Sequence, residues 1–268
     1  MLLIAAILWG LSYGIQSIMS NRLGPYTVIF IKGFSGFFLL AYCLFNKRKI
    51  DKKTILAGVL IGMINGIGLI FQQIGLSISS VSKVSFISGL YILFVPIIQM
   101  FTQKKPKNRF WFAVLIACIG MYFLCMNDKF VLSKGDIYTL IGAICFAFQI
   151  ILIDKNAKTS DFVPFCAMQQ MTTSLLAGIL MIIFEKPQLS DFSGLLLPIL
   201  YAMFASGMIA QLMQNRYQRD VEPTLASLIM SLESVFGALS GWLLLNQGLS
   251  PRELTGCILI FISIIIAE

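Results

Sequence analysis

The chain has 268 residues, of which 58% are hydrophobic and 12% are charged, and its formal net charge is +8. Soluble domains carry about 25% charged residues, so a soluble globule could not cover this much apolar surface. The sequence contains no histidine, which excludes imidazole acid–base catalysis and histidine-ligated zinc.

Ten apolar stretches succeed one another along the chain. Each approaches the ~20 residues that a helix needs to cross a hydrocarbon core of about 30 Å. They are too long and too uniformly apolar for barrel strands, and open strands are not viable in lipid, so we expect helices. A removable signal peptide is not expected, because no basic residue precedes the first stretch. The predicted spans are residues 2–20, 26–45, 55–75, 84–101, 110–126, 135–153, 162–184, 193–214, 223–245 and 252–267.

The loops between these stretches differ in charge. Of the 20 Lys and Arg residues, thirteen lie in loops on one side and six in the opposite loops. Short loops rich in Lys and Arg stay in the cytoplasm, so we expect both termini to be cytoplasmic and the protein to lie in the inner or plasma membrane. The excess positive charge predicts contact with anionic membrane lipids. No nucleic-acid partner is expected, because no basic surface exists away from the membrane.

The second five stretches echo the first five, which divides the chain into residues 1–130 and 131–268. Because each half has an odd number of helices, the two copies would have opposite orientations. We therefore predict an all-α integral membrane fold of ten transmembrane helices, built as two inverted five-helix repeats with a substrate site near the midplane. A duplicated scaffold without a transport role is the alternative. The aligned pairs are Tyr13 with Phe146, Gln16 with Gln149, Gly68 with Gly207, and Gln72 with Gln211.

Motifs for catalysis and cofactor binding are missing from the sequence. It has neither a G-x-x-x-x-G-K-[ST] phosphate loop nor a G-x-S-x-G elbow, and no carboxylates are clustered. The six cysteines all fall inside apolar stretches, without metal or redox spacing. We expect no cofactor, no metal and no enzymatic activity. Two other classes stay open: a membrane-embedded enzyme acting on lipid-linked substrates, and a non-transporting scaffold or sensor.

Several short motifs carry a resemblance to a known family. The first half reads LWGLS at residues 8–12, GP at 24–25, FIKG at 30–33 and FISGLY at 86–91. The second half reads VEPTLASLI at 221–229, LESVF at 232–236 and GWLLL at 241–245. In this order and spacing they resemble an EamA-type transporter of the drug/metabolite transporter superfamily. The resemblance implies ten helices, a central cavity and transport of small metabolites, often export.

The chain departs from this family pattern at three places. Asn246-Gln247 stands where Gly-Glu is usual, Glu233-Ser234 stands where Glu-Pro is usual, and Lys32 stands where arginine is common. The missing glutamate puts any shared gating role of that residue in doubt.

Two charged residues fall inside predicted spans. Glu233 lies near mid-bilayer, where a charge costs roughly 2.5–3.5 kcal/mol, so it should face a cavity, pair or stay protonated. It is our candidate for proton coupling, with a packing hydrogen bond as the alternative. Lys32 either snorkels outward or lines a cavity, where it would pair with Glu233 or receive a substrate carboxylate. Lys83, at the outer mouth, is expected to be a solvated loop charge.

Polar and aromatic residues in the central spans complete the candidate site. Trp9, Tyr13 and Gln16 share one face of the first helix. We expect a small amphipathic, amino-acid-like substrate, moved by alternating access and exported by a monomer or homodimer, with proton coupling as an option. The predicted substrate-binding residues are Trp9, Tyr13, Gln16, Lys32, Asn65, Gln72, Tyr91, Phe146, Gln149, Gln211 and Glu233.

Overall fold

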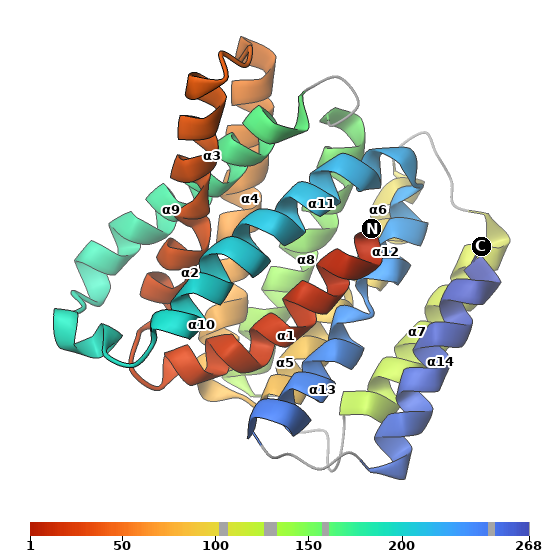
Figure 1. Cartoon of the computed structure of the whole chain (residues 1–268). Coiled ribbons are helices and arrows are strands. Elements are labelled where there is room, and N and C mark those ends of the chain that lie inside the picture. The colour runs from red at the N-terminus through yellow and green to blue at the C-terminus, as the bar shows by residue number, and fades with distance from the viewer. Residues whose placement is uncertain (102–106, 126–132, 157–160, 246–249, 268) are drawn as a thin grey trace.

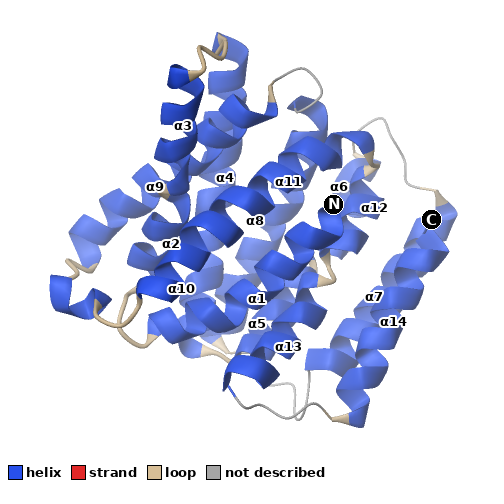
Figure 2. Cartoon of the chain, in the orientation of Figure 1, coloured by secondary structure: helices blue, strands red, loops and turns tan. Residues whose placement is uncertain are grey.

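The computed structural model describes residues 1–101, 107–125, 133–156, 161–245 and 250–267. Every regular element in these residues is a helix (Figure 2), which confirms the predicted helical class for them. Eight helical stretches are long and apolar enough to cross a membrane, and a shorter apolar helix covers Asn108–Phe123. The count of ten crossings stays a prediction. The predicted boundary between residues 130 and 131, and Asn246 and Gln247, lie outside the described residues.

The helices of the first half follow the predicted spans closely. They are α1 (Leu2–Ser20), α2 (Pro25–Gly33), α3 (Ser35–Phe45), α4 (Lys52–Ile78), α5 (Val81–Gly89), α6 (Tyr91–Met100) and α7 (Asn108–Cys125).

The second half contains more short elements. They are α8 (Lys134–Asn156), α9 (Phe162–Phe184), the 3-10 turn η1 (Leu189–Phe192), α10 (Leu196–Leu200), the π-helical segment η2 (Tyr201–Ile209), α11 (Ala210–Tyr217), the 3-10 turn η3 (Gln218–Asp220), α12 (Pro223–Met230), α13 (Glu233–Leu245) and α14 (Pro251–Ala267).

Three predicted spans are broken in the middle rather than continuous. Breaks occur at Phe34 between α2 and α3, at Leu90 between α5 and α6, and at Ser231-Leu232 between α12 and α13. The backbone at Phe34 and Leu90 stays right-handed, and each N–H bonds to the carbonyl three residues back. These are tight turns of 3-10 type, so they end one helix and start the next with little change in direction.

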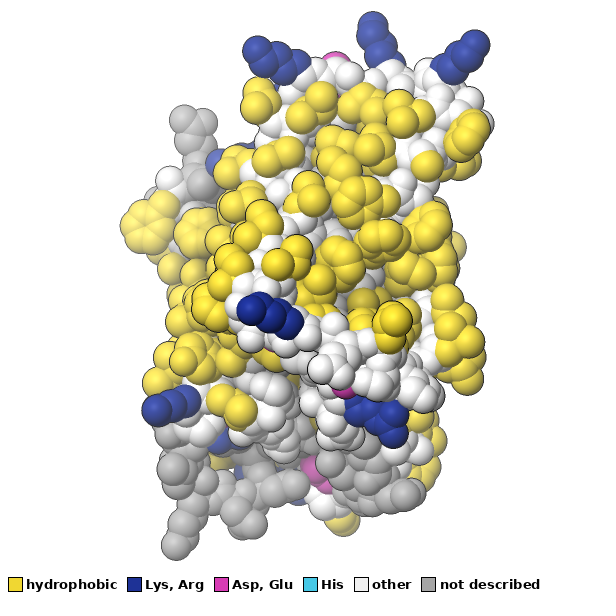
Figure 3. All heavy atoms as spheres, turned by 90° about the vertical axis from the view of Figure 1, so that its left-hand side faces the viewer, with side chains coloured by type: hydrophobic (Ala, Val, Ile, Leu, Met, Phe, Trp, Pro, Cys, Tyr) yellow, Lys and Arg dark blue, Asp and Glu magenta, His cyan; other side chains and the backbone are white. Residues whose placement is uncertain are grey.

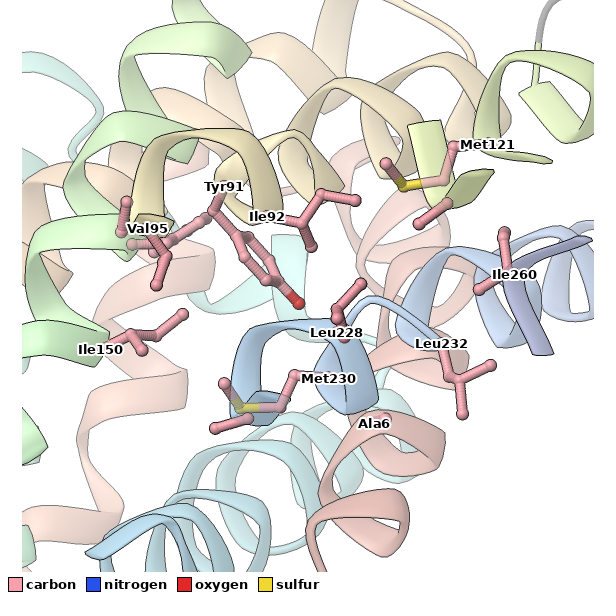
Figure 4. Close-up of a cluster of buried hydrophobic side chains, with 14 of the residues drawn as sticks. Ala6, Tyr91, Ile92, Val95, Met121, Ile150, Leu228, Met230, Leu232 and Ile260 are labelled. Carbon is pink, nitrogen blue, oxygen red and sulfur yellow. The ribbon is translucent and has the colours of Figure 1, made fainter. Parts of the chain in front are cut away.

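The arrangement in space brings the two halves into contact. In Figure 1, α1 crosses in front of α4 and α8, and α7 and α14 lie side by side at one edge. The helix α4 packs against α8 and α9 of the second half, and α1 packs against α13. A large apolar core joins both halves, and Figure 4 shows part of it, where Tyr91, Ile92 and Val95 of α6 approach Leu228 and Met230 of α12.

Glycines allow these close helix contacts. A Cβ on Gly62 would lie 2.5 Å from the carbonyl oxygen of Gln169, and one on Gly10 would collide with Phe236. The same stripe on α4 includes Gly58 and Gly66, both beside α9. Small residues on a helix face let backbones approach in this way in membrane bundles, as the spacing of these glycines predicts.

The outer surface suits a lipid environment. Apolar side chains cover most of the face in Figure 3, and Lys and Arg side chains project from its upper end. Large side chains such as Phe45, Phe101 and Ile182 are mostly exposed. An apolar face of this extent is unusual for a soluble monomer, which agrees with a multi-pass membrane protein.

Candidate functional site

Residues of both halves line a central cavity of about 60 Å³. Its wall draws on α1, α2, α4 and α6 from the first half and on α8, α9, α11, α12 and α13 from the second. All of the predicted substrate-binding residues lie on this wall, and their contact with a substrate stays a prediction. They are Trp9, Tyr13, Gln16, Lys32, Asn65, Gln72, Tyr91, Phe146, Gln149, Gln211 and Glu233.

Six further residues, outside the predicted substrate-binding set, also line the cavity. Ser12 lies one turn before Gln16, and Gln214 lies three residues after Gln211, so helical spacing could have added both. The apolar members look the same in sequence as lipid-facing residues. The six residues are Ser12, Leu69, Ile150, Gln170, Gln214 and Met230.

Glu233 begins α13 directly after the break in the ninth span, and its side chain is 6% exposed. Tyr13 donates a long hydrogen bond of 3.5 Å to Glu233 Oε1. Gln72 in turn donates from Nε2 to Tyr13 Oη at 2.9 Å and to Ser88 Oγ at 2.9 Å. A helix N-terminus favours a negative charge, so the break places the carboxyl where the backbone stabilises it.

Lys32 lies in the last turn of α2, beside the break in the second span. It is only 5% exposed and lines the cavity, so it does not snorkel outward. A cation is favoured at a helix C-terminus. Its ammonium forms no hydrogen bond or ion pair with any residue that the structure describes. Lys32 and Glu233 attract each other electrostatically across the cavity, without direct contact.

Other polar side chains of the wall form only some of the hydrogen bonds that they could make. Trp9 Nε1 donates to the Ser206 carbonyl at 3.1 Å, and the Gln16 amide nitrogen bonds to Ser12. The Gln16 carbonyl oxygen is buried and has no hydrogen-bond partner. In Figure 4 the Tyr91 hydroxyl points away from α6 toward α12, and it interacts with the Glu233 carboxyl. Buried polar groups without partners are uncommon, so the Gln16 carbonyl oxygen is available to a solute.

Glutamine side chains of the second half form an amide network in the wall. Gln149 Nε2 and Gln211 Nε2 both donate to Gln214 Oε1, at 3.3 and 2.9 Å. Gln214 Nε2 donates to Gln218 Oε1 at 2.9 Å, and Gln218 Nε2 donates to the Ile150 carbonyl at 2.6 Å. These hydrogen bonds join α8 to α11 and η3.

The two broken helices of the fourth and ninth spans touch each other beside the cavity. Ser234 Oγ donates to the Ser85 carbonyl at 2.9 Å. A Cβ on Gly89 would lie 2.7 Å from Ser234 Oγ and 2.8 Å from Met121 Sδ, so a larger residue at the end of α5 would force these side chains to shift. Discontinuous helices place backbone ends at the binding sites of many transporters.

Lys83 differs from the expectation of a solvated loop charge. Its Nζ lies 2.6 Å from Asp136 Oδ2 at the start of α8, and the two side chains are 21% and 1% exposed. The ion pair joins the fourth and sixth spans, one from each half. The expectation was wrong because sequence spacing could not show that the first turns of α5 and α8 meet.

The cavity offers binding groups rather than a metal site. In the described ranges, no group of three or more His, Cys, Asp or Glu residues could hold a metal ion. The wall instead combines one cation, one carboxyl, amides and aromatic rings, which suits recognition of a small amphipathic solute.

Comparisons with known proteins agree with this reading of the fold. An "Uncharacterized transporter" of Archaeoglobus fulgidus is 26% identical over 268 residues, covering 100% of this chain and 84% of that protein. A solved structure described only as "Crystal structure of protein" has a TM-score of 0.79 at 14% identity, covering 100% of this chain and 95% of the other; it supports the fold alone. The pattern of the EamA-like transporter family matches residues 1–126 and 133–267. The chain belongs to the EamA-like transporter family, within the drug/metabolite transporter superfamily.

Proposed function

We propose that this protein is a secondary active transporter that moves a small amphipathic, amino-acid-like metabolite by alternating access. The observation that carries the proposal is the central cavity, which both halves build and which holds an unpaired ammonium and a buried carboxyl. Charged groups inside a membrane bundle are costly and mark solute or ion pathways.

The architecture that we propose has ten transmembrane helices in two inverted repeats, residues 1–130 and 131–268, with both termini cytoplasmic. Three observations support it. The family pattern matches each half of the chain separately. The fourth and ninth spans, which correspond in the two repeats, are both broken. In Figure 1 the start of α1 and the end of α14 lie toward the same side of the molecule.

Glu233 is the residue that we propose for coupling to protons, with net export as the direction. Its carboxyl is almost fully buried, and the hydrogen bond that it accepts from Tyr13 is long at 3.5 Å. A carboxyl held this loosely can exchange a proton for a cationic solute group without dismantling the surrounding packing.

Transport by purified protein in liposomes tests this proposal. We would measure uptake and counterflow of labelled apolar amino acids and related amphipathic metabolites, with and without a pH gradient. We expect counterflow of at least one solute, stimulated by the gradient. The Glu233→Gln variant should lose the gradient effect and keep counterflow, whereas Lys49→Met, which removes an exposed cation outside the cavity, should behave like the wild type. Absence of flux for every solute would overturn the transporter proposal, and a full gradient effect in Glu233→Gln would overturn the coupling role.

A further inference from the structure

We infer that Lys32 and Glu233 are two separate charge subsites, which bind the carboxylate and the ammonium of a single zwitterionic solute. This inference rests on the proposed function and names the residues that determine its specificity. The feature that supports it is the separation of the two charges. Both groups line the same cavity, yet no direct ion pair joins them in the described structure.

The carboxylate subsite is built around Lys32. Its ammonium has three N–H donors, and none of them is used by a described residue. Asn65, on the neighbouring helix α4, also lines the cavity and makes no side-chain hydrogen bond within the described residues. A buried ammonium without hydrogen-bond acceptors is costly. A solute carboxylate would supply the acceptors and the direct ion pair that Lys32 lacks, and Asn65 could add a donor from the same cavity wall.

Gly207 and Gln170 hold the backbone of this subsite in place. A Cβ on Gly207 would collide with the Lys32 carbonyl oxygen, so the second half packs directly on the end of α2. Gln170 Nε2 donates to the Gly207 carbonyl. The backbone of Lys32 is therefore packed against η2, which Gln170 joins to α9, and this suits a binding residue better than a mobile surface charge.

The ammonium subsite is built around Glu233. An ionised carboxylate has about four acceptor positions, and the hydroxyls of Tyr13 and Tyr91 both interact with this one. A solute ammonium can use the remaining positions. The Gln16 carbonyl oxygen, buried and unpaired on the same wall, provides a further acceptor.

The pairing of charges favours a zwitterion over a simple anion or cation. A monoanion would satisfy Lys32 and leave Glu233 without a partner, and a monocation would do the reverse. An unpaired charge in a buried site is expensive. The rest of the wall includes Trp9, Leu69, Phe146 and Met230, so the solute would carry an apolar group beside its two charges.

Three probes that share one apolar group test the inference: leucine, 3-methylbutylamine and 4-methylpentanoate. Binding to purified protein is followed by the shift in melting temperature. We expect leucine to bind more tightly than either singly charged probe. Charge-assisted hydrogen bonds are strong enough that Lys32→Met should reduce the preference for leucine over the amine about tenfold or more. Glu233→Gln should likewise reduce the preference for leucine over the acid.

Two further variants separate specificity from folding. Lys32→Arg keeps the charge and should retain the preference for leucine, and Lys49→Met, which removes an exposed cation away from the cavity, should retain it as well. If Lys32→Met does not fold, Lys32→Gln replaces it with the same expectation. The inference is overturned if the amine binds the wild type as tightly as leucine, or if the uncharged variant, Lys32→Met or Lys32→Gln, leaves the preference unchanged.

The outcomes for the two proposals are distinguishable. If leucine shows the expected preference but no zwitterion is transported in liposomes, the subsites stand and the transport proposal fails. If solutes are transported but Lys32→Met and Glu233→Gln discriminate among the three probes as the wild type does, transport stands and the subsites fail.

Discussion

A single methyl group at Gly207 tests how tightly the second half packs against Lys32. In the Gly207→Ala variant the new Cβ would collide with the Lys32 carbonyl oxygen and lie 3.0 Å from the Ala202 carbonyl oxygen. Both neighbours are backbone atoms, so neither can rotate away. Overpacking of this kind costs about 1–3 kcal/mol, and replacing glycine in a helix returns up to about 1 kcal/mol.

The net expectation for Gly207→Ala is a loss of about 1–2 kcal/mol in the free energy of unfolding. At about 2–4 °C per kcal/mol for a chain near this size, the melting temperature in detergent should fall by roughly 2–8 °C. The variant should also bind leucine more weakly, because its Lys32 backbone must move.

Gly66→Ala is the matched control. Its Cβ would meet the flexible end of Leu176 at 3.2 Å and Thr173 Cα at 3.3 Å. The helix gain nearly offsets this milder contact, so the melting temperature should change by less than that of Gly207→Ala. Tight packing at Gly207 is refuted if Gly207→Ala melts at or above the melting temperature of the wild type, or if the two variants lower the melting temperature equally.

Three further variants probe contacts around the cavity. Lys83→Met leaves the buried Asp136 carboxylate without its partner at 2.6 Å; we expect a loss of about 3 kcal/mol, measured by thermal unfolding, and a smaller loss when Asp136→Asn is added. The Glu185 carboxylate accepts three hydrogen bonds of 2.6–2.8 Å from the first turn of α2. Glu185→Gln should therefore lower the free energy of unfolding by about 1–2 kcal/mol and speed amide hydrogen exchange in that turn. An unchanged exchange rate would show that Glu185 does not cap the N-terminus of α2. Trp9→Phe removes the 3.1 Å bond to Ser206 and should cost about 1 kcal/mol; a variant as stable as the wild type would show that this bond contributes nothing.

Much of the helical layout could be predicted from the sequence, because each helix of this fold must be apolar over about 20 residues. The predicted span 2–20 matches α1, and the span 162–184 matches α9. The breaks at Phe34, Leu90 and Ser231 could not be predicted. They depend on contacts between helices far apart in the chain, and hydropathy does not register a turn that leaves the side chains apolar.

The π-helical segment Tyr201–Ile209 could not be predicted from the sequence for the same reason. Its extra residue per turn brings the Ser206 carbonyl to Trp9 and the Gly207 carbonyl to Gln170. Such bulges often occur at functional sites, but they follow from tertiary packing rather than from local composition.

The candidate site was more predictable than the backbone around it. Polar side chains inside an apolar span must face protein or a cavity, so Gln16, Asn65 and Glu233 identify the wall without a structure. The pattern could not decide whether Lys32 snorkels, because both outcomes suit a lysine seven residues inside a span. The structure places the Lys32 side chain on the cavity wall, and only 5% of the residue is exposed.

Transport by alternating access requires this cavity to open to each side of the membrane in turn. The direct measurement is labelling of an Asn65→Cys variant, with the six native cysteines replaced, by membrane-impermeant thiol reagents applied to either side of oriented vesicles. We expect the new cysteine to react from both sides and to be protected from both by a bound zwitterion. Reaction from one side only, or labelling that no solute slows, would contradict alternating access through this site.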